Sequence, residues 1–245
     1  MRKQKLYRFR DSIEVEEYRD GRFGARGEKR LEKKKVTPEQ MKRQNLFNRT
    51  KKLRRMIKAN FQEDDLYWTL TFRKDIRPES IQEAKEIWKR MQRKIRDECK
   101  RLKMEFKWIV RIEKGSKGAV HIHLIMNKMD KPQFVKSLWK EYGHARLEYM
   151  YEEGGFKDLA AYMTKPDEEG EESYYSHSRN LPIPEPEVSM ISGEMEDSED
   201  IHIPEGYHLD KESLIEGINP ITGYPYRHYI LLKWEVKDVR SKCIP

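Results

Sequence analysis

The sequence has little cysteine and no long apolar run, and each absence excludes a class of protein. Its two cysteines, Cys99 and Cys243, lie far apart, which argues against a disulfide framework and against a cysteine-based zinc finger. No run of about 18 apolar residues occurs, so we expect no membrane-spanning helix and no membrane partner. The first residues, MRKQKLYRFRDSIEVEE, contain no apolar core of a secretory signal peptide. A soluble protein of the cytoplasm is therefore expected.

Charge is abundant, and its two signs are separated along the sequence. Of the 245 residues, 38% are charged, and the formal net charge is +8. The net charge is +13 over residues 1–60, +6 over 61–165 and −11 over 166–245. A strongly basic segment is typical of proteins that bind a polyanion such as nucleic acid. The basic front therefore predicts a nucleic-acid partner, and the acidic back would repel one.

Composition divides the chain into segments of different character. No lysine or arginine occurs from residue 180 to residue 210, a stretch rich in Pro, Ser and Glu that we expect to be a loop or linker. Near the N-terminus, a hairpin is predicted over residues 12–24 and a helix over 37–60, and near the C-terminus a strand over 227–236. The predicted segments are a basic N-terminal part (1–60), a core (61–181), an acidic linker (182–210) and a C-terminal part whose strand can join the core (211–245).

Hydrophobic patterning in the core segment alternates between strand and helix periods. The predicted order is strand, helix, strand, strand, helix, strand, helix, over residues 65–72, 78–103, 106–113, 119–126, 132–142, 145–151 and 156–164. Strands that are joined by a hairpin and alternate with helices favour an α+β fold, an antiparallel sheet covered by helices and of ferredoxin-like or RRM-like character. We expect the helices to cover one face and to leave the other face free for ligands.

Two histidines lie two residues apart on one predicted strand. Side chains at that spacing point to the same face, so His121 and His123 can converge on one divalent ion. Glu113 lies on the preceding strand, across the hairpin. Two imidazoles and one carboxylate leave coordination positions open for a phosphate, which suits Mg²⁺ or Mn²⁺. The alternative is a pair of polar residues on a solvated strand face, and His144 is a competing ligand.

The predicted helix over residues 156–165, FKDLAAYMTK, has an apolar stripe on one side. Tyr162 and Lys165 fall on the opposite side, about one turn apart. A phenol is a poor nucleophile at neutral pH, and a nearby lysine together with a metal-bound phosphate would favour the phenolate during attack. The same spacing also arises by chance in a chain with 13 tyrosines.

Taken together, three motifs in this order resemble the HUH endonuclease superfamily, in particular the rolling-circle replication initiators of phages and plasmids. They are YWTLTF at residues 67–72, HIHLI at 121–125 and YMTK at 162–165. The segment YYSHSRNL at 174–181 is similar to one that follows the third motif in phage-type initiators. The resemblance covers about residues 60–181, and it implies an HUH nuclease core.

The resemblance also implies a role for each site residue. His121, His123 and Glu113 would hold the divalent ion against a phosphate of single-stranded or origin DNA. Tyr162 would attack that phosphate, leaving a 5′-phosphotyrosine and a free 3′-hydroxyl, and Lys165 would help to position the phosphate. A single tyrosine implies help from a second protomer or a second event, so a homo-oligomer is one expectation. The chain has no GxxxxGK[ST] loop of a fused helicase, so a host helicase and polymerase, in a bacterial cell, are expected partners.

Two other functions are compatible with the same sequence features. One is the same chemistry in a transposase or relaxase of a mobile element, and the other is a non-catalytic nucleic-acid-binding module on the same fold. In every case the basic side chains are expected to contact phosphates, with aromatic residues among them stacking on unpaired bases. The residues expected to bind DNA are Arg43, Arg49, Lys51, Lys52, Arg54, Arg55 and Arg179.

Overall fold

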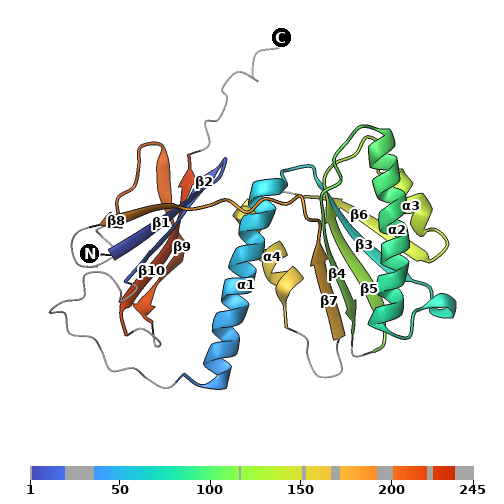
Figure 1. Ribbon diagram of the computed structural model, residues 1–245, viewed down its shortest axis with the longest axis horizontal. Helices are drawn as coiled ribbons and strands as arrows, with labels where there is room; N and C mark the ends of the chain where they lie inside the picture. The colour runs from blue at the N-terminus through green and yellow to red at the C-terminus, as the bar shows by residue number, and fades with distance from the viewer. Residues whose placement is uncertain are drawn as a thin grey trace, which may run out of the picture. The chain divides into compact units, whose positions relative to one another are not determined.

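The computed structural model describes residues 2–19, 36–115, 117–150, 153–166, 172–191, 201–219 and 223–234. The chain divides into two compact units, a smaller one of residues 1–41 and 184–245 and a larger one of residues 42–183. Each unit holds a five-stranded antiparallel sheet (Figure 1). The predicted α+β class is therefore confirmed. Within the described part of the chain, no helix is long and apolar enough to cross a membrane.

The sheet of the larger unit has the strand order β6-β3-β5-β4-β7. Its first four strands, with the two helices between them, follow the split βαβ order of ferredoxin-like folds, and β7 extends the sheet beside β4. Each element predicted in this region is present with slightly shifted bounds, whereas β7 was not predicted. The strands are β3 (Leu66–Phe72), β4 (Trp108–Lys114), β5 (Val120–Met126), β6 (Gly143–Tyr149) and β7 (Glu172–His177), and the helices are α1 (Pro38–Asn60), α2 (Ile81–Arg101), α3 (Gln133–Trp139) and α4 (Lys157–Thr164). Two short 3₁₀ turns, Lys74–Ile76 and Glu153–Phe156, complete it.

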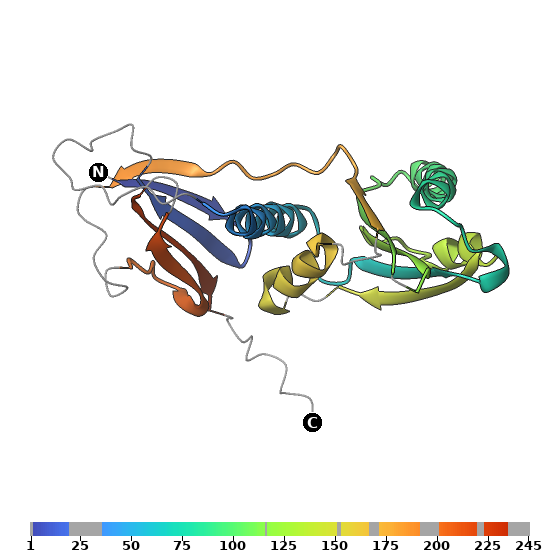
Figure 2. The same cartoon turned by 90° about the horizontal axis from the view of Figure 1, so that it is seen from below.

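One face of this sheet packs against α2 and α3 (Figure 2). Alternate residues of β3, β4 and β5 point to these helices, as the strand period of two requires. Three tryptophans, Trp68, Trp88 and Trp139, are almost fully buried there and supply much of the apolar area. This core holds the sheet rigidly behind the opposite face, which carries the histidines.

The histidine face is not wholly free, which corrects the expectation of an open face. Helices α1 and α4 pack over its β4 and β5 side, where Ile109 and Ile125 are fully buried against Ile57 of α1 and Met163 of α4. The reason is that this face also carries apolar residues, which together with the apolar stripes of both helices need burial. The face stays accessible toward the edge strand β6, where Arg146 is exposed.

Helix α1 begins as predicted. The Thr37 side chain accepts a hydrogen bond from the Gln40 backbone N–H at 3.2 Å, and the Gln40 side chain accepts one from the Thr37 N–H at 3.0 Å. This reciprocal pair is a capping box, and it starts the helix that was predicted over residues 37–60.

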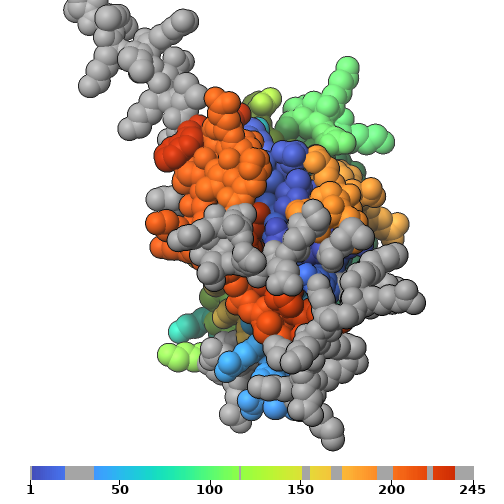
Figure 3. All heavy atoms as spheres, turned by 90° about the vertical axis from the view of Figure 1, so that its left-hand side faces the viewer, coloured from blue at the N-terminus to red at the C-terminus, as the bar shows by residue number. Residues whose placement is uncertain are grey.

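The smaller unit joins both ends of the chain in one sheet of order β8-β1-β2-β10-β9. In Figure 3 the blue atoms of the N-terminal strands lie between orange atoms of the C-terminal part. Its strands are β1 (Arg2–Arg8), β2 (Ser12–Tyr18), β8 (Glu187–Ile191), β9 (Tyr207–Ile218) and β10 (Pro225–Lys233).

Three expectations for these segments need correction. Strand β2 pairs with β1 and β10 rather than with a strand after the Asp-Gly turn, and residues 20–24 of the predicted hairpin lie outside the described residues. The C-terminal strand β10 pairs with β2 and β9 and not with the core sheet. The range 182–210 includes β8 and the start of β9 and is not only a linker. The pairs β2–β10 and β1–β8 join distant parts of the chain, so no local pattern reveals them, whereas β1–β2 and β9–β10 are pairs of strands close in sequence. Strand β8 also has no buried face to give it a period.

Candidate active site

The strand register brings the predicted ligands onto one face. Glu113 of β4 is the direct partner of His121 of β5, and Arg111 is the partner of His123. Directly opposed residues of antiparallel strands point to the same face. The prediction that the two histidines share a face with Glu113, away from the core of α2 and α3, is therefore confirmed.

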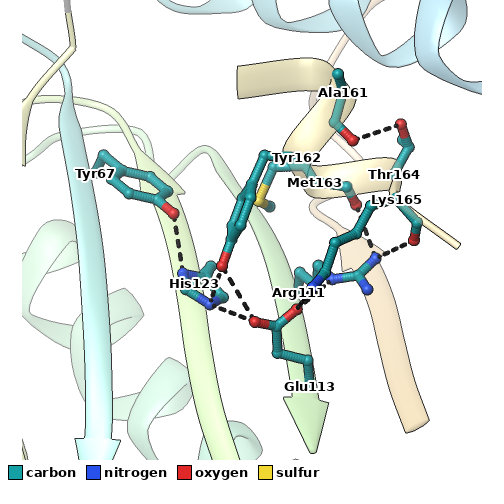
Figure 4. Close-up of polar contacts among 9 residues, drawn as sticks. All are labelled: Tyr67, Arg111, Glu113, His123, Ala161, Tyr162, Met163, Thr164 and Lys165. Carbon is teal, nitrogen blue, oxygen red and sulfur yellow. Dashed lines mark hydrogen bonds and ion pairs between the residues drawn. The ribbon is translucent and has the colours of Figure 1, made fainter. Parts of the chain in front are cut away.

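Helix α4 places the Tyr162 hydroxyl against this face (Figure 4). The hydroxyl oxygen lies 2.9 Å from His123 Nε2 and donates a hydrogen bond of 3.1 Å to Glu113 Oε1. His123 Nε2 and Glu113 Oε1 are themselves 3.2 Å apart. The three groups thus form a triangle with edges of about 3 Å, although Tyr162 is 39 residues from His123 and 49 residues from Glu113 in the chain. A phosphate approaching this point would meet a tyrosine oxygen, an imidazole and a carboxylate together.

Arg111 is a buried residue that connects Glu113 to the end of α4, and its role was not predicted from the sequence. Its side chain is fully buried, and its Nε lies 3.0 Å from Glu113 Oε2. Its other end donates to the backbone carbonyl oxygen of Lys165 at 3.0 Å and to that of Met163 at 3.4 Å. These carbonyls lie at the end of α4, where a helix needs donors from outside it, so Arg111 ties the helix that carries Tyr162 to the strand that carries Glu113. The available signal was a basic residue inside the apolar run WIVRIE, two residues before Glu113.

We predict that Arg111→Met destabilises the protein strongly. Methionine retains much of the volume but leaves the Glu113 carboxylate and two helix-end carbonyls without their buried donor. Removing one partner of a buried ion pair costs about 3–5 kcal/mol, and we expect a loss of free energy of unfolding of about 3 kcal/mol because Glu113 is partly solvated. Urea unfolding measures it, with the exposed Arg93→Met of α2 as the control. A change below about 1 kcal/mol would argue against this role.

Tyr67 is a second residue whose role the sequence did not reveal. Its hydroxyl oxygen lies 2.9 Å from His123 Nδ1, and the two rings stack with centroids 6.1 Å apart. Burial raises the pKa of Tyr67 to about 12, so its phenol is neutral at physiological pH. This contact fixes the orientation of the His123 ring, whose Nε2 faces Tyr162 and Glu113.

Electrostatics at the triangle favour a charged carboxylate and a neutral phenol. The hydrogen bond with His123, followed by that with Arg111, holds the pKa of Glu113 well below its usual range although burial opposes this. Burial, and then the negative charge of Glu113, raises the pKa of Tyr162 above its usual value. Lys165, expected to favour the phenolate, has its Nζ 3.8 Å from Glu113 Oε2 and 5.9 Å from the centre of the Tyr162 ring. In this arrangement the Tyr162 hydroxyl is therefore held protonated.

The donor set fits a divalent ion in part. Around Mg²⁺, ligand bonds of about 2.1 Å place adjacent ligand atoms about 3 Å apart, and His123 Nε2 and Glu113 Oε1 have this spacing. The ring of His121 lies on the same face with its centroid 6.4 Å from that of His123, and burial lowers its pKa, which favours the neutral form that binds metals. Among the described residues, no three His, Cys, Asp or Glu side chains are gathered closely enough to form a ready-made metal centre. His121 would therefore have to turn toward the other two donors.

The competing ligand His144 lies elsewhere. It is exposed on the edge strand β6, opposite Thr71. Its position on the open side of the face leaves it accessible to solvent.

The residues expected to bind DNA differ in exposure. Arg54 donates to the backbone oxygen of Gly155 at 2.9 Å and so helps to hold the segment before α4. Arg55 is only 7% exposed, which corrects its assignment as a phosphate contact. Arg43, Arg49, Lys52 and Arg179 are exposed, and Lys51 and Arg54 are half-buried. The buried side of α1 faces the sheet, which a charge count along the helix cannot show.

One comparison with known proteins bears on this site. Residues 65–167 match the family model of replication-associated protein ORF2. This family match runs from the start of β3 to the end of α4, and it includes Glu113, both site histidines and Tyr162. It spans less than half of the chain and leaves out α1 and the smaller unit. No curated protein and no solved structure matches this chain significantly. The family match is consistent with a rolling-circle replication initiator.

Proposed function

We propose that this protein is a metal-dependent endonuclease that nicks and rejoins single-stranded DNA to initiate rolling-circle replication. The observation that carries the proposal is the position of the Tyr162 hydroxyl, within 3.1 Å of both His123 and Glu113. The similarity of residues 65–167 to a replication-associated family supports it independently. A binding module without catalysis would have no need for a nucleophile held against an imidazole and a carboxylate.

In the proposed reaction the Tyr162 oxygen forms a bond to the scissile phosphorus while the bond from phosphorus to the 3′ oxygen breaks. The DNA is left with its 5′ phosphate esterified to Tyr162 and with a free 3′-hydroxyl. The phenol loses a proton and the 3′ oxygen gains one, so the step is balanced. Glu113 Oε1 accepts the hydrogen bond of the phenol and is the first acceptor within reach of that proton. Because one phosphate ester replaces another, a 3′-hydroxyl can attack the phosphotyrosine and rejoin the strand.

His121, His123 and Glu113 are proposed to hold Mg²⁺ or Mn²⁺. When bound, such an ion supplies a Lewis acid that neutralises charge on the scissile phosphate. Tyr67 would fix the orientation of the His123 ring through the contact at Nδ1. Lys165 would add positive charge beside the phosphate and favour the charge that develops there.

The DNA strand is proposed to reach the site across basic side chains. The exposed Arg43, Arg49 and Lys52 of α1 would contact phosphates, and Arg179 lies just beyond β7. The Arg49 guanidinium lies 5.7 Å from the ring centre of Tyr175, a half-buried residue that pairs with Arg111. Contacts from these basic side chains to phosphates would add affinity but would not distinguish one DNA sequence from another. Unwinding and synthesis would fall to a host helicase and polymerase.

We predict that Tyr67→Phe slows the reaction without unfolding the protein. The ring remains, but His123 loses the partner that orients it, and loss of such an outer contact typically costs about 10–100-fold in activity. The quantity to measure is the single-turnover rate of covalent adduct formation. Tyr142→Phe, the same change on the α3 side of the sheet, is the control. Equal rates for the Tyr67 variant and the wild type would refute this role.

The proposal is tested by incubating the full chain with short single-stranded oligonucleotides from the replicon that encodes it, together with Mn²⁺. A denaturing gel should show a covalent protein–DNA band and a released fragment with a free 3′-hydroxyl. If no oligonucleotide is cleaved under these conditions, the proposed nicking activity is wrong.

A further inference from the structure

A pocket of about 330 Å³ opens beside the nucleophile, and the proposed function gives it no role so far. Tyr162 forms one wall, so the pocket begins where the scissile phosphate would lie. Tyr67 and Phe156 supply further aromatic surface. The pocket belongs entirely to the larger unit and lies on the accessible side of the histidine face. Its size is in the range of small-molecule sites.

The backbone around this pocket is unusual. Phe156 begins α4 with φ 59° and ψ 24°, a left-handed conformation that bulky residues rarely adopt. Its ring is nonetheless buried, with 3% of its surface exposed. Conformations of this kind persist only where the surroundings impose them, and they concentrate at ligand sites. The aromatic floor of the pocket is thus held in place by the fold.

The charge of the pocket lining indicates which part of a DNA strand the pocket can bind. Two carboxylates, Glu148 and Asp158, lie in its lining, and no lysine or arginine does among the residues that the structure describes. One oxygen of Glu148, Oε1, accepts a hydrogen bond of 2.7 Å from Arg146, which is not in the lining. An ionised carboxylate only accepts hydrogen bonds, so this lining repels phosphate and attracts donor groups. Aromatic walls are suited to the flat faces of an unstacked base.

We propose that this pocket receives the nucleobase next to the scissile phosphate and that its carboxylates select guanine over thymine. The inference rests on the proposed function, because Tyr162 places the base relative to the bond that is cut. Guanine offers two adjacent donors, N1–H and the N2 amino group, which one carboxylate can accept together. Thymine offers a single N–H between two carbonyl oxygens, which would face the carboxylates and be repelled. Base-edge contacts of this kind are those that give sequence preference.

The test begins from the mapped nick. Each base flanking it is replaced in turn by the other three, and single-turnover adduct formation is measured with the full chain. At one of the two positions that flank the nick, we expect the oligonucleotide with guanine to form the adduct about 10-fold or more faster than the one with thymine. In the double variant Glu148→Gln, Asp158→Asn this ratio should fall to below about 3-fold, because an amide can also donate to a thymine carbonyl. Asp97→Asn, on the other side of the sheet, is the control and should keep the wild-type ratio.

Equal rates for all bases at both flanks, or a guanine preference that survives in the carboxylate double variant, would overturn the inference.

The failure of the proposed function is distinguishable from the failure of this inference. If the wild type forms no adduct, the proposed function fails. The pocket is then tested by binding alone. Fluorescence anisotropy measures the affinity of the Tyr162→Phe variant for oligonucleotides in which thymine replaces each guanine in turn. A loss of affinity at one position that the double variant removes supports a guanine pocket, and affinities that do not change at any position refute it.

Discussion

The Tyr162→Phe variant is expected to form no covalent adduct with DNA while it still binds the same single strand. The change removes one oxygen and leaves the ring, so the packing of α4 against the sheet is retained. It also removes the hydroxyl contacts to His123 and Glu113, whose net effect on stability is about 1 kcal/mol each or less. Loss of the nucleophile should lower the rate by at least about 10⁴-fold, as with other enzymes that use one. Gel-shift and denaturing-gel assays on one oligonucleotide separate binding from chemistry.

Tyr142→Phe is the matched control for this result. Tyr142 packs partly buried against the core of α2 and α3, on the far side of the sheet from the histidines. We expect its adduct yield to equal that of the wild type. A covalent complex that survives denaturation in the Tyr162 variant at wild-type yield would mean that another residue is the nucleophile.

Removal of divalent ions is expected to have the next largest effect. With EDTA, nicking should fall by at least about 10³-fold, because the negative Glu113 and the phosphate would then face each other without a neutralising charge. Mn²⁺ or Mg²⁺ added in excess should restore it. The low pKa of Glu113 means that the carboxylate is already ionised and ready to bind an ion at neutral pH.

A pair of histidine variants tests which residues hold that ion. His123→Ala should abolish restoration by Mn²⁺, whereas His144→Ala, exposed on β6, should leave it unchanged. Isothermal titration of Mn²⁺ provides a readout that does not depend on catalysis. Full cleavage in EDTA, or equal Mn²⁺ affinity in the wild type and the His123 variant, would remove these histidines from the mechanism.

Local patterns were sufficient to predict the elements that build the site. The period of two in AVHIHLIM puts His121 and His123 on the face opposite the α2 core, and the hairpin brings Glu113 beside them. The apolar stripe of residues 156–163 predicts helix α4, although Tyr162, expected on the opposite side, is half-buried and packs against the same cluster as Met163. These inferences need only neighbours in the sequence or a tight turn.

The rest of the site depends on contacts between distant segments. From its sequence context, Arg111 is expected to be a solvated charge. Only the packing of α4 against the sheet shows that its side chain is buried near Tyr162. Tyr67 meets His123 across a strand pair separated by 56 residues. Burial, and then the Glu113 carboxylate, raises the pKa of Tyr162, whereas the sequence suggested that Lys165 would favour the phenolate. Such distances are set by tertiary packing, which no residue spacing encodes.

The most direct test of the central claim is to identify the residue that becomes linked to DNA. The wild-type protein is incubated with a cleavable single-stranded oligonucleotide and Mn²⁺, digested with nuclease and protease, and examined by mass spectrometry. The proposed function predicts one nucleotide-bearing peptide, with the 5′ phosphate on Tyr162. A nucleotide on any other residue, or cleaved DNA with no linked peptide, would contradict it.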